Sequence, residues 1–429
     1  SRSCSRSCRQ GRESSQGYRQ EKTQGPPERT GCMAWMRKLS LFKDLRTVSF
    51  IVALILAIPG LWKGFTGFYT WLSPFIMLNS VFATRTFVLM NIVAGAVLLF
   101  ILFRRRWFCR NLCPAGWCFD KISLLNKSGS KNFKRVPDIG KWLAFISLVT
   151  AFFGLPLFVF LDPMALFNGF FTGFAGGFSA VSAASAASMV LFALILVLHL
   201  FYPGIWCSKL CPLGGLQRAF FDIRLRLSRL FSRNKGLDIT VDHSGRRYFL
   251  MSGTGLLAGL ILPKLLKPGS ETVIRPPGAV EPRLFNILCC RCGSCIKACP
   301  TGILKPNTDF TEPLAWMTPV ASFKTGYCLE TCSLCSRVCS SGAITRFSTD
   351  DKRRLYMGTA EIDLSKCYLS NNRECNKCKE SCPYSAISFV RQDNLLNTLP
   401  VIKIGKCVGC GACEAVCPAE CINIKPVDR

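Results

Sequence analysis

The stretch Cys407–Pro418, CVGCGACEAVCP, decides the fold of the C-terminal region, and Cys289–Pro300, CCRCGSCIKACP, repeats its spacing. Both follow C-x2-C-x2-C-x3-C and end in proline. Short gaps of this kind wrap the chain around one metal group. The run is typical of [4Fe–4S] ligation, in which the fourth cysteine serves a partner cluster. Each stretch therefore predicts thiolates arranged around iron.

Two further cysteine groups lie between these stretches. One has an extra residue in its first gap and Ser340 in place of the proline, and the other has a longer first gap. We predict four [4Fe–4S] clusters. Structural zinc is the alternative, but zinc ribbons use two separated cysteine pairs. The sixteen predicted iron ligands are Cys289, Cys292, Cys295 and Cys299; Cys328, Cys332, Cys335 and Cys339; Cys367, Cys375, Cys378 and Cys382; and Cys407, Cys410, Cys413 and Cys417.

Composition narrows the class of protein. The 429 residues include 26 cysteines and only two histidines, with a formal net charge of +29. Tightly repeated cysteine spacing favours metal ligation over disulfides. The basic residues cluster beside apolar spans, which argues against nucleic-acid binding. No residue pattern indicates a catalyst of substrate turnover, and no Gly-rich phosphate loop supports nicotinamide or flavin binding.

Uncharged apolar spans precede the cysteine groups. Each is near the length that a membrane-crossing helix needs, and buried helices are the alternative. The sequence predicts an α-helical membrane bundle of four helices plus a fifth anchor helix, followed by an α+β ferredoxin-like domain. The five predicted spans are Thr47–Trp62, Thr86–Phe103, Trp142–Leu161, a segment within Ser188–Trp206, and Tyr248–Pro263.

The distribution of Lys and Arg predicts the orientation of these spans. Basic residues gather before the first span, between the second and third, and between the fourth and fifth, whereas the loop 162–187 has none. We expect a multi-pass protein of a bacterial inner membrane, in contact with lipid, with its C-terminal domain on the periplasmic side. Arg246-Arg247 before the fifth span is similar to a twin-arginine export signal, although an ordinary basic flank is the alternative.

A second cysteine constellation lies in the apolar half. Cys109 and Cys113, and likewise Cys207 and Cys211, form C-x3-C-P after a tryptophan. Both motifs are expected at the cytoplasmic face, where four thiolates would suffice for one more iron–sulfur cluster. Paired structural or redox-active thiols are the alternative.

These patterns divide the chain into six segments. The first is expected to be disordered or to lie upstream of the true start. The segments are 1–32; a four-helix membrane domain, 33–212; a basic cytoplasmic loop, 213–247; the anchor helix, 248–267; a Pro/Gly-rich linker, 268–283; and the domain with four cluster motifs, 284–429.

The half with paired C-x3-C-P motifs resembles the NapH-like membrane ferredoxins. The region from Arg246, with its Arg-Pro-Pro-Gly linker at Arg275–Gly278 and four cysteine groups, is similar to NapG-like and MauM-like ferredoxins. The resemblance implies electron transfer from a membrane quinol to a periplasmic reductase or other redox partner. The rival hypotheses are an accessory or maturation factor for a periplasmic metalloenzyme and a subunit whose clusters only stabilise the fold.

Overall fold

The computed structural model describes residues 40–57, 63–87, 91–104, 106–125, 136–172, 183–231, 244–265, 273–309, 312, 314–324, 326–371, 373–391 and 398–426. The chain divides into two compact units, Ser1–Leu45 and Arg46–Arg429. Every contact discussed below lies within the second unit. The predicted segment 1–32 lies outside the described residues.

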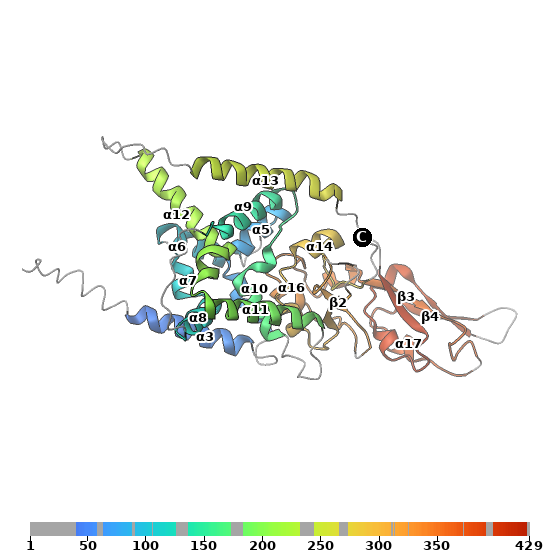
Figure 1. The fold of residues 1–429 in the computed structure, drawn as a ribbon. Helices are drawn as coiled ribbons and strands as arrows, with labels where there is room; N and C mark the ends of the chain where they lie inside the picture. Colours follow the sequence, from blue (N-terminus) through green and yellow to red (C-terminus); the bar gives the residue numbers. More distant parts are fainter. Residues whose placement is uncertain are drawn as a thin grey trace, which may run out of the picture. The chain divides into compact units, whose positions relative to one another are not determined.

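Between residues 40 and 265, the residues that the structure describes are mainly helical (Figure 1). In chain order these are α3 (Ser40–Ala57), α4 (Phe68–Trp71), α5 (Pro74–Thr84), α6 (Asn91–Phe103), α7 (Trp107–Asn111), α8 (Pro114–Ser123), α9 (Ile139–Phe152), the 3-10 turn η1 (Val159–Leu161), α10 (Pro163–Thr172), α11 (Ala183–Phe201), the π-helical turn η3 (Trp206–Leu210), α12 (Pro212–Phe231) and α13 (Ser244–Leu265).

Proline fixes the start of several of these helices. Pro114 and Pro212 each occupy the first helical position, where the missing N–H removes no hydrogen bond. The preceding residues, Cys113 and Cys211, are part of the C-x3-C-P motifs. Their sulfur atoms accept backbone N–H groups of the first turn, from Gly116 at 3.2 Å and Gly214 at 3.4 Å. The motif therefore places one cysteine at the N-terminus of a helix.

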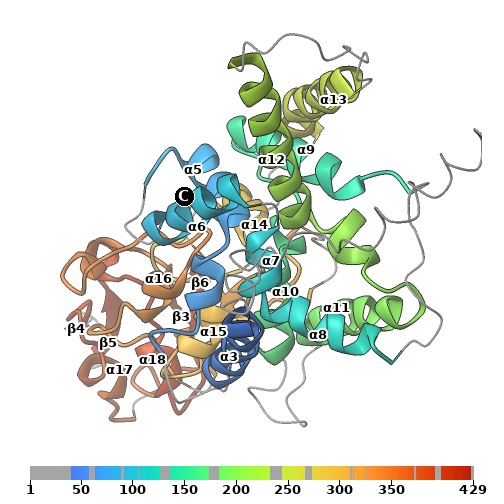
Figure 2. The ribbon, with the colours of Figure 1, turned by 90° about the vertical axis from the view of Figure 1, so that its left-hand side faces the viewer.

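The segment predicted to be a basic loop contains a helix instead. α12 packs against α9, and α13 packs against the same helix, as Figure 2 shows. Leu213, Leu216 and Ala219 recur at helical spacing and are buried. Burial of this apolar stripe explains the helix, because helical stability in proteins comes mainly from packing of one face.

No helix in the described part of the chain is both long enough and apolar enough to cross a membrane. α6 and α9 have 13 and 14 residues, or about 20 Å at ~1.5 Å per residue, against a bilayer core of about 30 Å. Gly154, with φ +80°, and Pro156 interrupt the third predicted span. The predicted membrane bundle was therefore wrong, and the multi-pass inner-membrane location that depended on it was wrong too.

Several of these helices leave large apolar side chains exposed. Ile51 on α3, Leu99 on α6 and Leu257 on α13 are 49%, 57% and 59% exposed.

The C-terminal region is built from short elements between cysteine loops. The helical elements are α14 (Pro282–Leu288), α15 (Ser294–Ala298), α16 (Leu334–Val338), η4 (Asp351–Arg354), α17 (Lys377–Glu380), η5 (Ile404–Lys406) and α18 (Ala412–Ala415). The strands are β1 (Leu304–Pro306), β2 (Pro319–Ala321), β3 (Gly358–Ile362), β4 (Ile387–Arg391), β5 (Thr398–Ile402) and β6 (Ile422–Pro426). The predicted α+β character of this region agrees with these elements.

The described strands of this region form three antiparallel two-stranded sheets, whose strands lie between or after the cysteine loops along the chain. β1 pairs with β2, β3 with β6, and β4 with β5. Two-stranded sheets are marginally stable alone, so packing must stabilise them. Four isoleucines follow the last cysteine of each group by four or five residues: Ile303, Ile344, Ile387 and Ile422. All four are buried in the same apolar core as several of the cysteines.

Candidate iron–sulfur centres

The first and second cysteine groups exchange their fourth members. Cys295 is close enough to Cys289, Cys292 and Cys339 for their charges to interact. Cys335 interacts in the same way with Cys299, Cys328 and Cys332. We call these sets site 1 (Cys289, Cys292, Cys295 and Cys339) and site 2 (Cys299, Cys328, Cys332 and Cys335), and together the first pair.

The cavity at site 2 shows this exchange directly. All four cysteines of site 2 line a cavity of about 360 Å³, together with Ile303, Leu304 and Lys352. Cys299 comes from the first group along the chain and the other three come from the second. Proline after the fourth cysteine of the first group, Pro300, also lines the cavity. The turn at this proline therefore carries Cys299 away from its own group and into the neighbouring site.

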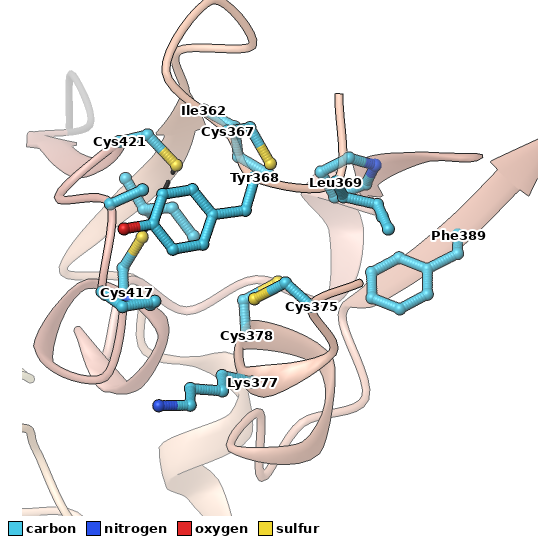
Figure 3. A pocket seen from close by; sticks show the side chains of 14 residues that line it. Ile362, Cys367, Tyr368, Leu369, Cys375, Lys377, Cys378, Phe389, Cys417 and Cys421 are labelled. Carbon is cyan, nitrogen blue, oxygen red and sulfur yellow. Dashed lines mark hydrogen bonds between the residues drawn. The ribbon is translucent and has the colours of Figure 1, made fainter. Parts of the chain in front are cut away.

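The third and fourth groups repeat the arrangement. Cavities of about 390 and 320 Å³ each contain three cysteines of one group and the fourth cysteine of the other. Figure 3 shows the larger cavity, with Cys417 opposite Cys375 and Cys378. We call the two sets, together the second pair, site 3 (Cys367, Cys375, Cys378 and Cys417) and site 4 (Cys382, Cys407, Cys410 and Cys413).

Cysteines outside the predicted ligands lie beside the sites. The Cys421 sulfur is 3.5 Å from the Cys417 sulfur, and Cys421 lines the cavity of site 3 (Figure 3). Cys290 is buried beside Cys292 and belongs to a small apolar cluster with Ile76 and Val159. The side chains of Cys290 and Cys421 are both buried.

The two pairs touch through their backbones. The Cys328 N–H of site 2 donates to the Cys410 carbonyl of site 4 at 2.8 Å, and Met357 N–H donates to Val408 oxygen at 2.9 Å. Gly411, with φ +80°, lies so close to Phe323 that a Cβ there would be 2.1 Å from the ring. Sites 2 and 4 are therefore the members through which the pairs meet.

The four cysteines of the C-x3-C-P motifs also come together. Cys113 interacts electrostatically with Cys109, Cys207 and Cys211, and we call this set the helical site. Gln217 donates its amide N–H to the Cys109 sulfur at 3.0 Å. Two motifs almost a hundred residues apart thus converge, as the sequence predicted they would if they shared one metal group.

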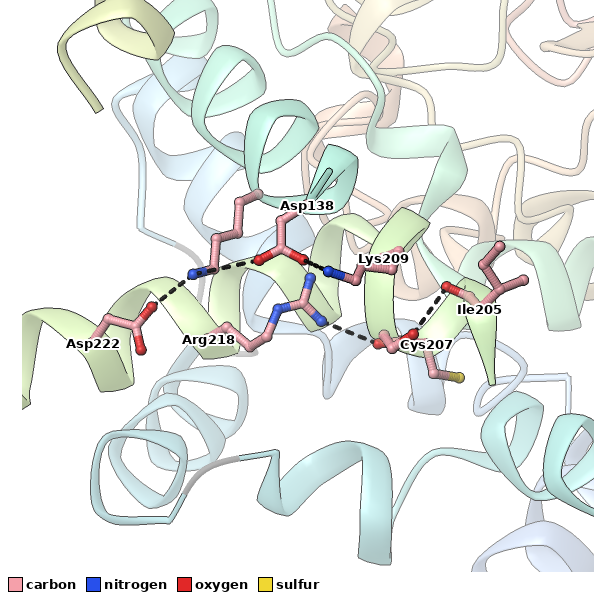
Figure 4. A network of polar contacts seen from close by, with 8 residues as sticks. Asp138, Ile205, Cys207, Lys209, Arg218 and Asp222 are labelled. Carbon is pink, nitrogen blue, oxygen red and sulfur yellow. Dashed lines mark hydrogen bonds and ion pairs between the residues drawn. The ribbon is translucent and has the colours of Figure 1, made fainter. Parts of the chain in front are cut away.

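A charged network borders the helical site, as Figure 4 shows. Arg218, which is 3% exposed, donates to the Cys207 carbonyl at 3.3 Å. Asp138 accepts from Lys209 at 2.8 Å and lies 3.8 Å from Lys141. Burial alone would raise the pKa of Asp138, but the Lys209 hydrogen bond and the surrounding positive charges lower it below its usual value.

Burial raises the pKa of several cysteines, whereas a hydrogen bond with Cys290 lowers the pKa of Cys292 to about 6. Burial raises the pKa of Cys289 and Cys410 to about 11, and raises that of Cys113 and Cys211 well above the ordinary value, where neighbouring thiolates add to the effect. A buried thiol of this kind stays protonated until a metal displaces its proton. Grouped buried thiols are therefore poor nucleophiles but suitable metal ligands.

The donor set fits an iron–sulfur cube better than a single ion. Every cysteine in the described residues is a free thiol. No group of three or more Cys, His, Asp or Glu side chains in that part of the chain is close enough together to hold one metal ion. Four cysteines nevertheless line the cavities of sites 2 and 4, and five, including Cys421, line that of site 3. Only thiol donors spaced around a larger group match both observations.

Polar contacts join the helical part to the first cysteine group. Lys297 donates its ammonium to Asn168, at 3.0 Å to the carbonyl and 2.9 Å to the side-chain oxygen. Asn168 in turn donates to the Ser294 hydroxyl at 2.7 Å, and Thr66 donates to the Ser294 carbonyl at 3.1 Å. All four side chains are buried. Site 1 is therefore anchored to α10 and to the loop before α4.

Sequence reasoning missed the basic and amide side chains around the sulfurs. Lys352 lies on η4, outside every cysteine motif, so spacing could not find it. Gln217 and Arg218 lie on α12, in a segment interpreted as a loop. The sequence does show Lys297 inside a cysteine motif. Its burial could not be predicted, because it depends on the packing of α10 against α15.

Comparisons with known proteins agree with this chemistry. A 4Fe-4S dicluster domain matches residues 372–421, and a 4Fe-4S binding domain matches residues 86–131 and 185–237, which include both C-x3-C-P motifs. The methylamine utilization ferredoxin-type protein MauM of Methylobacillus flagellatus is 32% identical over 41% of this chain and 76% of its own length. Ferredoxin-type protein NapG of Escherichia coli is 34% identical over 42% of this chain and 85% of its own length.

A third relative is also a ferredoxin-type protein. Ferredoxin-type protein NapF of Haemophilus influenzae is 31% identical over 44% of this chain and 99% of its own length. No solved structure matches the chain.

Proposed function

This chain belongs to the family of ferredoxin-type proteins that includes MauM and NapG, and on that premise we propose that it carries single electrons to a redox partner through [4Fe–4S] clusters held at sites 1 to 4. Its family consists of ferredoxin-type electron-transfer proteins, and its 4Fe-4S domains support iron–sulfur clusters as its cofactors. The count of four clusters and the assignment of sixteen ligands are parts of the proposal.

The exchange of fourth cysteines carries the proposal. Three cavities are each completed by a cysteine from a neighbouring motif, which is the ligand pattern of two-cluster ferredoxins. When bound, such a cluster gains or loses one electron without forming a bond to a substrate. Zinc offers no comparable chemistry at a Cys4 site, because it is not redox-active.

The protein's own groups would shape each site in two ways. Apolar side chains exclude water, as Ile303 does at site 2 and Ile387 at site 4. Backbone N–H groups donate to cysteine sulfur, from Ile344 to Cys339 at 3.4 Å and from Ala386 to Cys382 at 3.3 Å. Both water exclusion and hydrogen bonds to sulfur set the reduction potential of an iron–sulfur group.

We propose the helical site as a fifth iron–sulfur centre. The convergence of its four thiols and the domain match over both motifs support this assignment. The NapH-like origin of the helical half and the quinol donor stay predictions from the sequence. The acceptor in this proposal is a redox enzyme that receives electrons from the ferredoxin-like region.

The test is a redox titration of the anaerobically purified full chain, followed by electron paramagnetic resonance with iron and acid-labile sulfide analysis. We expect [4Fe–4S] signals from at least four centres that reduce reversibly. The proposal would be overturned if the protein contained zinc instead of iron, if its cysteines formed disulfides, or if it contained no acid-labile sulfide.

A further inference from the structure

The two pairs differ in how positive charge is buried near the cysteines. Lys352 is 2% exposed, and its ammonium donates to the carbonyl oxygens of Leu329 and Cys332, the latter at 2.8 Å. Lys352 lines the cavity of site 2, and its charge acts on Cys328 and Cys335. A buried ammonium group therefore lies beside the cysteines of site 2.

No acidic side chain neutralises this ammonium among the ion pairs of the described residues. Asp351, the residue before Lys352, is exposed, and its carboxylate accepts a hydrogen bond from the Ser348 hydroxyl. The carbonyl groups that hold Lys352 are dipoles and leave its unit charge in place. Cys328 and Cys335 of site 2 are acidic groups on which this charge acts.

Site 4, the counterpart of site 2 in the second pair, lacks such a cation. Its cavity is lined by its cysteines with Ala360, Ile387, Val408 and other uncharged residues, including Tyr384. Burial raises the pKa of Tyr384, so this phenol stays neutral. Among described residues 358–426, none of the charged side chains is buried. The lysines near site 3, such as Lys377, are exposed.

The physical effect of this difference is electrostatic. An iron–sulfur group that accepts an electron gains one negative charge, so a nearby positive charge favours the reduced state and raises the reduction potential. The interaction is stronger in the low dielectric of a protein interior than in water. Exposed cations are screened by solvent and salt and act much more weakly.

We propose that Lys352 sets the potential of the iron–sulfur group at site 2 and places it above the potential of site 4. Lys352 is a positioning and charge-supplying residue, not a ligand. This inference rests on the proposed function, since it requires that site 2 bind a cluster.

The experiment compares full-length, anaerobically prepared variants by redox titration with electron paramagnetic resonance. Lys352→Gln and Lys352→Met remove the charge, Lys352→Arg keeps it, and Arg353→Met removes an exposed charge from the same turn. We expect Lys352→Gln to lower the equilibrium constant for one-electron reduction of one centre about tenfold. This corresponds to a fall of about 59 mV in the midpoint potential of that centre. That centre is a higher-potential member of the wild-type set.

The controls make the result decisive. Lys352→Arg should keep the wild-type midpoint, and Arg353→Met should leave every midpoint nearly unchanged. If Lys352→Met fails to load iron, the Gln and Arg variants still decide the question, because Gln retains a donor for the Leu329 carbonyl. The inference fails if loaded Lys352→Gln keeps all midpoints, or if Arg353→Met shifts the same centre equally. Absence of iron in the wild type would instead overturn the proposed function.

Discussion

The first pair and the second pair share the same arrangement of cysteines in different surroundings. The first pair is anchored to the helical part through Lys297 and Asn168 and contains the buried ammonium of Lys352. The second pair is enclosed by the β3–β6 and β4–β5 sheets and has its charged side chains at the surface. The comparison teaches that motif spacing brings three thiols of each set together, whereas the surroundings of the set depend on residues outside the motif.

The largest expected effect concerns ligand exchange, which both pairs share. Cys339→Ser should abolish the same magnetic resonance signal as Cys289→Ser, because both residues belong to site 1. It should spare the signal lost in Cys328→Ser. Each variant should lose one cluster's share of iron. If Cys339→Ser and Cys328→Ser removed one and the same signal, each motif would supply its own cluster and the proposed pairing would be wrong.

The helical site extends the comparison to a third region. Changing Cys109 and Cys207 together to serine should remove one further cluster's share of iron and sulfide and leave both pairs loaded. Cys118→Ser is the matched control, because this cysteine is near the site but outside both motifs. Unchanged iron content in the double variant would exclude a fifth cluster.

Gly411 lies where the two pairs meet, and its replacement tests how much this close contact contributes to stability. Gly411→Ala should lower the free energy of unfolding by about 2–5 kcal/mol, from the left-handed backbone and the collision with Phe323. Gly302 has φ +66° but nothing within 4 Å, so Gly302→Ala should cost only about 1–2 kcal/mol. Urea unfolding of loaded protein measures both. Equal costs would mean that the close approach to Phe323 is unimportant.

Asp138 is a partly exposed charge, in contrast to buried Lys352, and we expect it to contribute little to the stability of the fold. Its pKa is lowered in the folded state, so its stabilising effect is present above the unfolded value near 3.8 and is lost as the pH falls below it. Asp138→Asn should lower stability by about 0.2–1 kcal/mol. The difference from wild type in thermal unfolding should stay constant between pH 8 and pH 5. A difference that vanished within this window would contradict the assigned pKa direction.

Cysteine spacing predicted the candidate sites because ligands of one cluster must lie close along the chain. It predicted the convergence of Cys109, Cys113, Cys207 and Cys211 as well, from the repeated C-x3-C-P pattern alone. It left open which groups exchange ligands, since that depends on packing between loops such as those of Cys328 and Cys410.

The membrane prediction failed for a physical reason that hydropathy cannot register. Gly154, with its positive φ, and Pro156 end the helix within the third apolar span. Lys352 escaped prediction because nothing in its local sequence distinguishes it from the exposed Arg353 and Arg354 beside it. Burial of one residue in this turn is decided by its tertiary neighbours.

The exchanged fourth cysteine also constrains how the protein matures during its synthesis on the ribosome. Site 2 has its last ligand at Cys335 and site 1 at Cys339, whereas site 4 is complete at Cys413 and site 3 at Cys417. Both members of a pair thus become able to accept iron within four residues of chain growth. On the proposed ligand assignment, we therefore expect each pair, not each motif, to receive iron and sulfide as one unit.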